Sequence, residues 1–456
     1  MSCNRCVDVV VGLNAGSESK GKIISHIANR YDAMCRDGAC NASHGIIFSE
    51  KKFFFHQIPC GCLHNRDAKL IIGAAAQIDI NHLKHEIDIL KEQDRWLDSK
   101  GNVRLMIDRH AVIVDALDKV AENGGRMPDC GDVYFHPHDC KKNMELGNTC
   151  IGCSSLPEDS AWRKLGSTTF GCGANYIRKI ARGTKMALLS GQPLDLVKYF
   201  RDKCPEDATN DEISEKILEI VNSGPITDWA SAVDVVPIRY AKEDEFLQQF
   251  LGDTVEIKNR MIDNNQNIML EGTQGSVLSI HHGVPFKTTS RDTNCSAWCA
   301  DAGISALAVR DVYGVTRTFP IRVAGDSGPL GTEVTWDEIT KFAESPTPII
   351  EQTSATKRVR RCFLLDEKIL RRSLDLNRPT KLMLSFVDYL HYSDYGKSSW
   401  DNLSQKTRDW ITTLESKMGI FFNYLSTGPA PEHTVIRKSP SELLGHIQAH
   451  CPKDEC

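Results

Sequence analysis

The chain has 456 residues, of which 41% are hydrophobic and 25% are charged, so it can bury a large core and is not a disordered polypeptide. Its formal net charge of −5 is small for this length and gives no general attraction to nucleic acid or to an anionic membrane surface. Because no apolar run approaches a bilayer span and the N-terminus lacks a secretion signal, we expect a cytoplasmic protein that binds neither membrane nor nucleic acid.

Residues 9–31 predict a strand, a phosphate-binding loop and a helix. The β-branched residues 9–11 are typical of a buried strand, and residues 23–31 have a helix-like pattern. Residues 16–22 fit G-x-x-x-x-G-K, in which glycines let backbone N–H groups approach a phosphate and the lysine meets its charge. Ile23 stands where nucleoside triphosphatases have Ser or Thr, which argues against that class. An ordinary glycine-rich turn is the alternative interpretation.

This loop resembles the glycine-rich loop of adenylosuccinate synthetases, which reads G-D-E-G-K-G-K. Those enzymes join aspartate to the 6-position of IMP with GTP, and their aspartate takes the proton from N1 of hypoxanthine. Ser17 stands in its place here. One branch, the phage enzymes that make 2-aminoadenine precursors from dGMP, is similar but carries a small residue there. The resemblance implies catalytic roles for Ser17 and Lys22 and a triphosphate site formed by Gly16, Glu18, Ser19, Lys20, Gly21 and Lys22.

A second loop, residues 37–45, resembles the family's G-G-x-N-A-G-H-T loop and puts His44 in the position of its general acid. A positioned imidazolium can hydrogen-bond the purine O6 while negative charge builds on that oxygen, although a lone histidine in a loop is more often only solvated. The resemblance also implies that Asn41 contacts the purine monophosphate and that Mg²⁺ is held near Ser17 and Ser43.

The next segments predict scaffold. The apolar, alternating run 46–59 predicts two short strands, residues 70–74 predict a buried strand, and residues 81–92 predict a helix with one apolar face. Residues 115–165 are polar and rich in Cys and His, and we expect an insertion there.

Zinc binding in this insertion is an open alternative. The 17 cysteines are an odd number without a secretion signal, which indicates reduced thiols rather than a disulfide framework. Cys150 and Cys153 have the pair spacing of zinc sites, and Cys130 and Cys140 lie nearby in the sequence. One close pair alone leaves a structural zinc site and plain thiols in a loop both open.

Residues 166–176 resemble the family's G-T-T-G-R-G-I-G-P-A-Y loop, and residues 179–182 resemble its K-V-A-R. Hydroxyls and glycines in a loop can hold a monophosphate, and an arginine completes a bidentate grip. The resemblance therefore implies that Ser167, Thr168 and Arg182 bind the purine monophosphate. In the family this arginine reaches into the neighbouring subunit's site, so we expect a homodimer. Taken alone, these residues would be a loop and a solvated helix charge.

Residues 184–265 have a mainly helical pattern and predict scaffold, including an amphipathic helix at 211–224. Residues 268–270 predict a buried strand, followed at its carboxyl end by residues 271–276, which resemble the family's E-G-A-Q-G-T. The amide of Gln274 suits a purine edge, and Thr289 suits the phosphate or sugar.

The chain departs from the ordinary family pattern at residues 289–293 and 315–325. At both places it resembles the phage-type enzymes and their archaeal relatives instead. We expect Val323, in the second of these segments, to contact the purine monophosphate.

Residues 354–361 resemble the family's aspartate loop, T-T-G-R-x-R-R, and contain three arginines within four residues. A basic run is commonly a solvated face, but a dicarboxylate beside a nucleotide phosphate requires such planar, permanently charged groups. We assign Thr356 and Arg358 to aspartate, with Arg358 also near the monophosphate, and Arg360 to aspartate or the triphosphate.

Residues 382–388 predict a last buried strand with a polar end. Here the family has T-K-L-D, in which the lysine packs on guanine and the aspartate accepts its N1–H and N2–H; Phe386 replaces the lysine and Asp388 keeps the acid. An aromatic ring can stack on any purine, so ATP becomes the expected phosphate donor. Ser426 and Gly428 match the family's closing loop beside the base, although these residues could be purely structural turns.

We therefore expect one α/β domain over residues 1–456, with a central, mostly parallel sheet flanked by helices, as in adenylosuccinate synthetases. The expected reaction joins dGMP and L-aspartate with ATP and Mg²⁺ to give N6-succino-2-amino-2′-deoxyadenylate, in a host cytoplasm if a phage encodes the chain. An IMP- and GTP-dependent synthetase and a nucleotide-binding pseudoenzyme are the alternatives. Without the aspartate, deprotonation has to be reassigned, with water held by Ser17 or Glu18 as one hypothesis.

Overall fold

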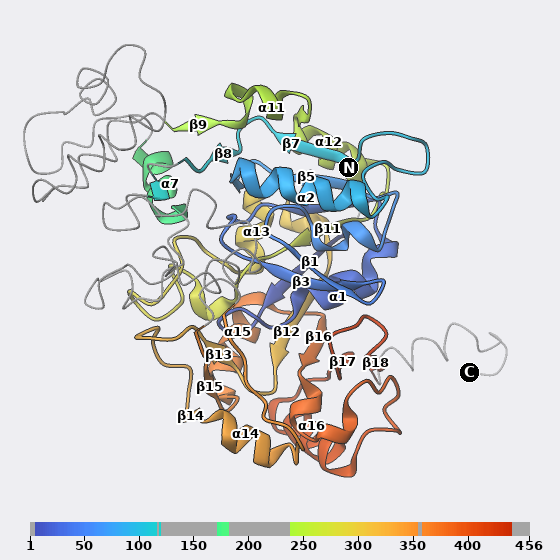
Figure 1. The fold of residues 1–456 in the computed structure, drawn as a ribbon, viewed down its shortest axis with the longest axis vertical. Coiled ribbons are helices and arrows are strands. Elements are labelled where there is room, and N and C mark those ends of the chain that lie inside the picture. The colour runs from blue at the N-terminus through green and yellow to red at the C-terminus, as the bar shows by residue number, and fades with distance from the viewer. Residues whose placement is uncertain (1–4, 116–117, 120–170, 182–237, 354–357, 440–456) are drawn as a thin grey trace, which may run out of the picture.

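The computed structural model describes residues 5–115, 118–119, 171–181, 238–353 and 358–439 (Figure 1). Most of the expected insertion at 115–165 and the expected helix at 211–224 lie outside the described residues. Among the helices that are described, none has both the length and the apolar character needed to cross a bilayer.

A ten-stranded sheet runs through the middle of the molecule, in the order β10-β7-β5-β2-β11-β1-β12-β16-β17-β18. Every neighbouring pair is parallel except β17 with β18, which confirms the predicted, mostly parallel sheet. The strands of this sheet are β1 Val7–Gly12, β2 Ala33–Arg36, β5 Lys69–Ile72, β7 Leu105–Asp108, β10 Leu251–Gly252, β11 Ile268–Glu271, β12 Val309–Arg317, β16 Lys381–Ser385, β17 Tyr424–Ser426 and β18 Thr434–Ile436.

Strand β1 lies at the centre of this sheet and is buried on both faces. Val9 and Val11 belong to one hydrophobic core, and Val10, between them, belongs to a second core on the opposite face. Strands of a parallel sheet that is covered on both sides are almost continuously apolar, which is why the run of valines predicts this position.

Helices pack on both faces of the sheet. Apolar residues of α1 and α2 join the core that contains Val10, whereas those of α12, α13, α15 and α16 join the core that contains Val9 and Val11. Asp79 caps α2 by accepting hydrogen bonds from the backbone N–H groups of Asn81 and His82. The helices are α1 Lys20–Ile27, α2 Ile80–Glu92, α7 Cys172–Ala181, α11 Glu245–Gln248, α12 Thr254–Asp263, α13 Cys295–Asp301, α14 Trp336–Phe342, α15 Glu367–Asn377 and α16 Gln405–Met418.

Three small sheets complete the described part of the fold. β3 His44–Phe48 and β4 Lys51–Phe55 form an antiparallel hairpin, which confirms the two short strands predicted at 46–59. Its turn residues, Ser49 and Glu50, both have positive φ, as a tight hairpin turn requires. The other two sheets are β6 Gln77–Ile78 with β8 Val112–Ile113 and β9 Arg239–Tyr240, and β13 Ile321–Arg322 with β15 Arg361–Phe363 and β14 Glu333–Val334.

The described part of 184–265 is less helical than its pattern predicts. It contains α11 and α12, but also β9 and β10, each only two residues long. β10 adds to the edge of the central sheet beside β7, and β9 pairs with β8, so tertiary pairing rather than local periodicity determines these strands.

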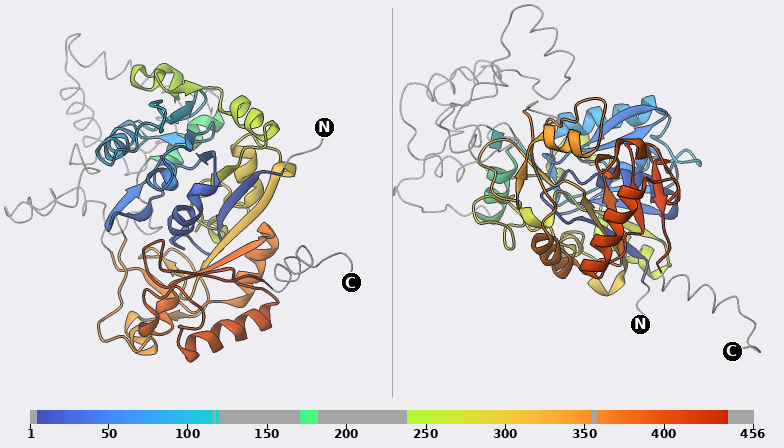
Figure 2. Two further views of the ribbon diagram at one scale, coloured as in Figure 1. Left: turned by 90° about the vertical axis from the view of Figure 1, so that its right-hand side faces the viewer. Right: turned by 90° about the horizontal axis from the view of Figure 1, so that it is seen from below.

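The chain order of the strands creates a switch point at the centre of the sheet. From β1 the chain moves to β2, β5, β7 and β10 on one side, returns to β11, and then moves to β12, β16, β17 and β18 on the other. The two ends of the colour scale accordingly occupy opposite halves of the molecule (Figures 1 and 2). Ligands of open α/β sheets bind beyond the carboxyl ends of the strands at such a point.

Candidate active site

The loop between β1 and α1 lies at the carboxyl edge of the central sheet. Three of its residues have left-handed backbone conformations, Gly16 at φ +88°, Ser17 at φ +58° and Ser19 at φ +66°. Helix α1 then begins at Lys20 without a side-chain cap, so its first N–H groups are not covered by a neighbouring hydroxyl or carboxylate. This is the geometry of an anion-binding loop at a helix N-terminus.

Glu18 holds this loop together from inside. Its carboxylate is fully buried and accepts hydrogen bonds from the backbone N–H groups of Asn14 (3.1 Å) and Gly16 (2.8 Å). The ammonium of Lys20 lies 2.7 Å from the other carboxylate oxygen and also donates to the backbone carbonyl of Gln274. Glu18 is therefore enclosed by the loop, whereas Ser17 is exposed.

Lys22 connects α1 to the far side of the sheet. Its ammonium donates to Ser426 Oγ (2.7 Å) and to the carbonyl oxygens of Gly428 (2.6 Å) and His433 (2.5 Å). Burial lowers its pKa to about 7, although the nearby carboxylates of Asp388 and Glu432 act in the opposite direction. The predicted triphosphate lysine thus lies among the predicted base-side residues.

His44 opens β3 and lies against the end of β11. Its Nδ1 is 2.6 Å from Glu271 Oε1, and the guanidinium of Arg36 is 2.6 Å from the same oxygen. Burial, and then the charge of Arg36, lower the pKa of His44 to about 4. Cys60 completes the cluster, donating from its backbone N–H to Glu271 Oε2 (2.7 Å) and from Sγ to Oε1 (2.9 Å).

Three predicted site residues around His44 have buried polar atoms without a hydrogen-bond partner in the described part of the chain. These atoms are Asn41 Oδ1, Ser43 Oγ and Gln274 Oε1. Gln274 has φ +60°, an uncommon conformation for a residue with a side chain. Buried polar atoms are normally satisfied, so these three atoms are available to a bound ligand or water. We call Asn41, Ser43, His44 and Gln274 the β2/β11 side of the site.

The loop 289–293 supports this side. Arg291 is buried, donates to the carbonyl of Asp37 (2.8 Å), pairs with Asp301 and lies 5.0 Å from the ring of Trp298. Asp292 accepts from Ser279 Oγ at 2.6 Å. Thr289, predicted to contact the phosphate or sugar, donates its backbone N–H to Leu278. The Arg-Asp departure from the family pattern thus ties the loop after β2 to the loop after β11.

On the other side of β1, Arg317 joins three loops at the end of β12. It is fully buried and donates to the carbonyl of Ser17 at 3.1 Å. The same guanidinium lies 3.8 Å from the ring centroid of Phe386 and pairs with the carboxylate of Glu351. Phe386 has φ +59°, and its carbonyl accepts from Thr318 Oγ1 at 2.7 Å.

Asp388 lies beside this stack. Burial raises its pKa to about 7, while Lys22 acts in the opposite direction. We call the set formed by Lys22, Arg317, Phe386, Asp388, Ser426 and Gly428 the β16/β17 side of the site.

The predicted aspartate loop is described only from Arg358 onward, and Thr356 lies outside the described residues, as do Ser167, Thr168 and Arg182. Arg358 is exposed, and its backbone pairs with Thr353. Arg360 donates its backbone N–H to Glu351, the residue that pairs with Arg317. The carbonyl of Val323 accepts from Ser327 Oγ at 2.6 Å. Glu351 therefore links the aspartate loop to the β16/β17 side.

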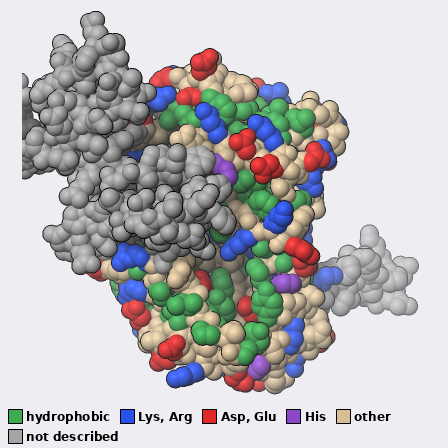
Figure 3. All heavy atoms as spheres, in the orientation of Figure 1, with side chains coloured by type: hydrophobic (Ala, Val, Ile, Leu, Met, Phe, Trp, Pro, Cys, Tyr) green, Lys and Arg blue, Asp and Glu red, His purple; other side chains and the backbone are tan. Residues whose placement is uncertain are grey.

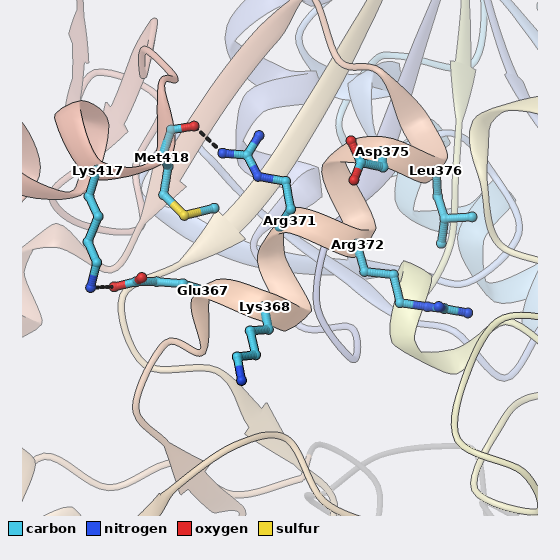
Figure 4. A pocket seen from close by; sticks show the side chains of 8 residues that line it. All are labelled: Glu367, Lys368, Arg371, Arg372, Asp375, Leu376, Lys417 and Met418. Atoms are coloured by element: carbon cyan, nitrogen blue, oxygen red, sulfur yellow. Dashed lines mark hydrogen bonds and ion pairs between the residues drawn. The ribbon is translucent and has the colours of Figure 1, made fainter.

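A separate surface groove contains none of the predicted site residues. It is lined by α15 and the end of α16, and two of its cations have partners within it (Figure 4). Lys417 pairs with Glu367 at 2.7 Å, and Arg371 donates to the carbonyl of Met418. Charged side chains of both signs are also interspersed on the face drawn in Figure 3. The groove thus mixes charges of both signs and shares no residue with the predicted site.

The sequence model of the adenylosuccinate synthetase family matches residues 9–127 and 153–397. The chain belongs to the adenylosuccinate synthetase family. It is a ligase that forms a C–N bond, and members of the family use Mg²⁺ and a nucleoside triphosphate. The unmatched residues 128–152 fall inside the expected insertion, and the match on either side of them is longer than we expected.

Named relatives agree with this assignment over nearly the whole chain. Adenylosuccinate synthetase of Methanocaldococcus jannaschii is 27% identical over 430 residues, 94% of this chain and 95% of that protein. The enzyme of Thermococcus sibiricus is 26% identical, with 94% and 97% covered.

Two solved structures have the same fold. The fully ligated adenylosuccinate synthetase of Plasmodium falciparum has a TM-score of 0.66 at 19% identity, covering 95% of this chain and all of the other. The succinoaminodeoxyadenylate synthetase of cyanophage S-2L, bound to dGMP and dATP as an energy donor, has a TM-score of 0.60 at 19% identity, covering 98% and 100%.

Three residues of the site received no role from the sequence. Arg36 and Glu271 hold His44, and Arg317 connects Ser17 with Phe386. The sequence carried a signal for each, because Arg36 and Glu271 end short, otherwise apolar strands that are fully buried, and Arg317 ends the buried second part of β12. A charged group in that position is costly unless it has a partner or a ligand.

Proposed function

We propose that this adenylosuccinate synthetase family member joins dGMP to L-aspartate with ATP, giving N6-succino-2-amino-2′-deoxyadenylate, ADP and phosphate. The observation that carries the proposal is Ser17, exposed at φ +58° in the centre of the phosphate loop, where the resemblance places an aspartate in ordinary family members. The fold is shared with an S-2L enzyme that binds dGMP, although at 19% identity this likeness supports the fold alone.

The physical reason lies at the 2-position of the purine. A carboxylate placed to take the N1 proton of hypoxanthine would crowd or trap the exocyclic amine of guanine, whereas a serine leaves room for it. Glu18 does not replace the lost carboxylate, because its two oxygens are occupied by the loop and by Lys20. The 2-amino group therefore fits beside Ser17 without an adjacent, competing anion.

For the phosphate donor we propose ATP. The carbonyl of Phe386 accepts a hydrogen bond from Thr318, and the guanidinium of Arg317 lies on its ring, so the ring is held in place. The ring offers an apolar surface to a purine and lacks the ammonium with which the family's lysine packs on guanine. Asp388, with its pKa raised to about 7 by burial, is easily protonated there. A protonated carboxyl can donate to N1 of adenine and accept from its amino group, whereas guanine requires the carboxylate.

The site groups support phosphoryl transfer followed by displacement. Lys20 and Lys22 lie at the start of α1, where they can neutralise a triphosphate on the helix N-terminus. His44 and Gln274 can hold the purine O6 as it receives the phosphoryl group, and the arginines after 357 can orient the aspartate carboxylates for attack of its amine on C6. Phosphate then leaves from C6.

The residues present also fit Mg²⁺. The buried Ser43 Oγ has no partner among the described residues, and hydroxyl oxygens and phosphates are ligand types that Mg²⁺ accepts. When bound, the ion would neutralise charge between the donor phosphates. Ser43 and Ser17 would hold it more weakly than a carboxylate, which places more of the coordination on substrate oxygens and water.

The purified protein, given ATP, Mg²⁺ and aspartate, should be offered dGMP, GMP, dIMP and IMP in parallel, with ADP release and nucleotide mass measured. We expect the highest kcat/KM with dGMP, and a higher kcat/KM for IMP would overturn the substrate assignment. With the preferred purine nucleotide, a kcat/KM for GTP at least tenfold above that for ATP, about 1.4 kcal/mol, would overturn the donor assignment.

An ordinary synthetase acting on IMP with GTP is the second candidate, because the curated relatives carry that name. The same assay separates it from the proposal. A pseudoenzyme is disfavoured, since a decayed site has no reason to keep His44 and Lys22 together with Gln274, whose Oε1 has no partner in the described part of the chain.

We also propose a homodimer in which Arg182, outside the described residues, completes the partner's monophosphate site. If an arginine of one chain completes the monophosphate site of the other, the complete site exists only in the assembled dimer. Activity should therefore fall on dilution below the dimerisation constant. Mixing an Arg182→Ala protein with a variant inactive at His44 should restore part of the activity, and a fully active monomer by light scattering would refute the shared site.

A further inference from the structure

Glu271, at the carboxyl end of β11, is fully buried and accepts four hydrogen bonds. The donors are Arg36 Nη1 (2.6 Å), His44 Nδ1 (2.6 Å), the backbone N–H of Cys60 (2.7 Å) and Cys60 Sγ (2.9 Å). Three of them meet at one oxygen, Oε1. No predicted role of the site used this carboxylate.

Arg36 keeps this carboxylate ionised. Burial alone would raise the pKa of Glu271, but the charge of Arg36 and the hydrogen bonds from His44 and Cys60 outweigh it and lower the pKa to about 2. The second terminal nitrogen of Arg36 donates to the carbonyl of Ala42, in the loop that leads to His44. One cation therefore fixes both the carboxylate and the segment that carries the imidazole.

The same contacts argue against a metal ion in this cluster. Ligand atoms of His44, Cys60 and Glu271 lie within 4.8 Å of one another, which in isolation suits a divalent cation. The guanidinium of Arg36, however, already occupies Oε1 with a positive charge. A second cation on that oxygen would be repelled at a distance of a few ångströms in a buried environment.

An ionised carboxylate has no proton to give, so the short contact to His44 requires that Nδ1 be the donor. The imidazole is then held in one ring orientation, with Nδ1 directed at Glu271 and Nε2 left without a hydrogen bond among the described residues. Fixing the tautomer and the orientation of a histidine by a buried carboxylate is a general way to direct its other nitrogen at a substrate.

We propose that Glu271 is a positioning residue that acts through His44, presenting Nε2 of the imidazole to the purine O6 while Arg36 holds the carboxylate in place. This inference rests on the proposed role of His44 at the purine. It assigns the two ring nitrogens separate tasks, Nδ1 to the protein and Nε2 to the substrate. An imidazole that carries its proton on Nδ1 has none on Nε2, so His44 takes up a second proton from solvent on Nε2 as negative charge builds on O6, and the ionised Glu271 stabilises the resulting imidazolium. It also explains why the ends of β2 and β11 are joined by a buried ion pair.

The test is a double-mutant cycle on kcat, with the purine nucleotide that the substrate survey shows to be turned over. Glu271→Gln should lower kcat about 100-fold and change the KM for the purine nucleotide by less than about threefold. In a His44→Gln background, which keeps a polar group near Nε2 but has no Nδ1, the same substitution should change kcat by less than about twofold.

Glu86 supplies a matched control. It is a second fully buried carboxylate, which accepts backbone N–H groups of His56, Gln57 and Ile58 but does not contact His44. Glu86→Gln should lower the melting temperature, because it removes a buried carboxylate that accepts backbone hydrogen bonds. It should leave kcat within about threefold of the wild-type value. Equal kcat losses from Glu271→Gln in both backgrounds would overturn the proposal, because they would mark a structural role.

A measurement on the unmutated protein decides the tautomer independently of activity. In the free protein labelled with ¹⁵N-histidine, the signal that disappears in His44→Gln should show a proton on Nδ1. An unprotonated Nδ1 would overturn the proposal. If no purine nucleotide is turned over, the proposed function fails, but the location of this proton still determines whether Glu271 orients His44.

Discussion

On the β2/β11 side of the site, three buried polar atoms have no hydrogen-bond partner among the described residues, whereas on the β16/β17 side the cations are already bonded to protein oxygens. Asn41, Ser43 and Gln274 supply the three unpartnered atoms. Lys22 donates to three oxygens of the 426–433 loop. The terminal nitrogens of Arg317 bond to Glu351 and to the carbonyl of Ser17, and only its Nε has no partner among the described residues. A ligand can therefore enter the first side without breaking protein hydrogen bonds, but on the second side it must compete for them.

The two sides therefore differ in the free-energy cost of binding a ligand. Preorganised groups lose little on binding, because their orientation is already fixed by the fold. A lysine that exchanges three protein oxygens for phosphate oxygens gains only the difference between two sets of bonds, and the loop that it leaves has to rearrange. We therefore expect the proposed phosphate donor, rather than the purine monophosphate, to change the conformation of the site.

The largest effect should come from removing Lys22, the lysine of the β16/β17 side. Lys22→Met should lower kcat/KM for ATP by about 10²- to 10³-fold, because one cation of a phosphoryl-transfer site is lost, while the KM for the purine nucleotide changes little. Steady-state kinetics with each substrate varied in turn measure this. Lys368→Met, in the surface groove, is the control and should leave kcat/KM for ATP and the KM for the purine nucleotide unchanged. A larger effect on the purine KM would contradict the division into two sides.

The next largest effect concerns Ser17, which lies between the two sides. Ser17→Asp should reduce kcat/KM for dGMP relative to that for IMP by at least about tenfold, since a carboxylate would trap the 2-amino group but could accept the N1 proton of hypoxanthine. Competition between dGMP and IMP, followed by product mass, gives the ratio directly. Ser17→Asn separates charge from size, because the amide has nearly the shape of the carboxylate. An unchanged ratio would remove the reason for the dGMP assignment.

A moderate effect should follow on the β2/β11 side. Gln274→Ala should raise the KM for the purine monophosphate about tenfold, or about 1.4 kcal/mol, because one hydrogen bond to the purine edge is lost without repacking of the protein. The KM for ATP should stay the same. Gln405→Ala, on the exposed surface of α16, provides the control. Equal increases in both KM values would show that Gln274 supports the whole loop instead of the purine.

The smallest expected effect is the uptake of part of a proton when ATP binds. Burial lowers the pKa of Lys22 to about 7, and a triphosphate beside the ammonium would raise it again. Between pH 7 and about 10 the free lysine is largely neutral and the liganded lysine is charged, so ATP binding at pH 8 should take up part of a proton. Calorimetry in buffers of different ionisation enthalpy measures this uptake. It should vanish in Lys22→Met, and proton release in the wild-type protein would contradict the assignment.

Much of the fold could be predicted from the sequence because its signals are local. The valine run of β1, the alternation that gives β3 and β4, and the apolar face of α2 capped by Asp79 each lie within one element. These patterns follow from the periods of strands and helices, which the chain carries wherever its elements are finally placed. The order of seven motifs then identified the family, as the match over residues 9–127 and 153–397 confirms.

The partners of the site residues were decided only by the tertiary structure. His44 and Glu271 are 227 residues apart, and Lys22 and Ser426 are 404 apart, yet both pairs are in hydrogen-bonding contact. Such contacts depend on the order of the strands, which places β11 between β1 and β2 after a long excursion of the chain. Local periodicity specifies which residues form a strand but not which strand lies beside it. The sequence therefore identified the family and the loops in which we predict the site, and the sheet order alone determined which side chains of those loops face one another.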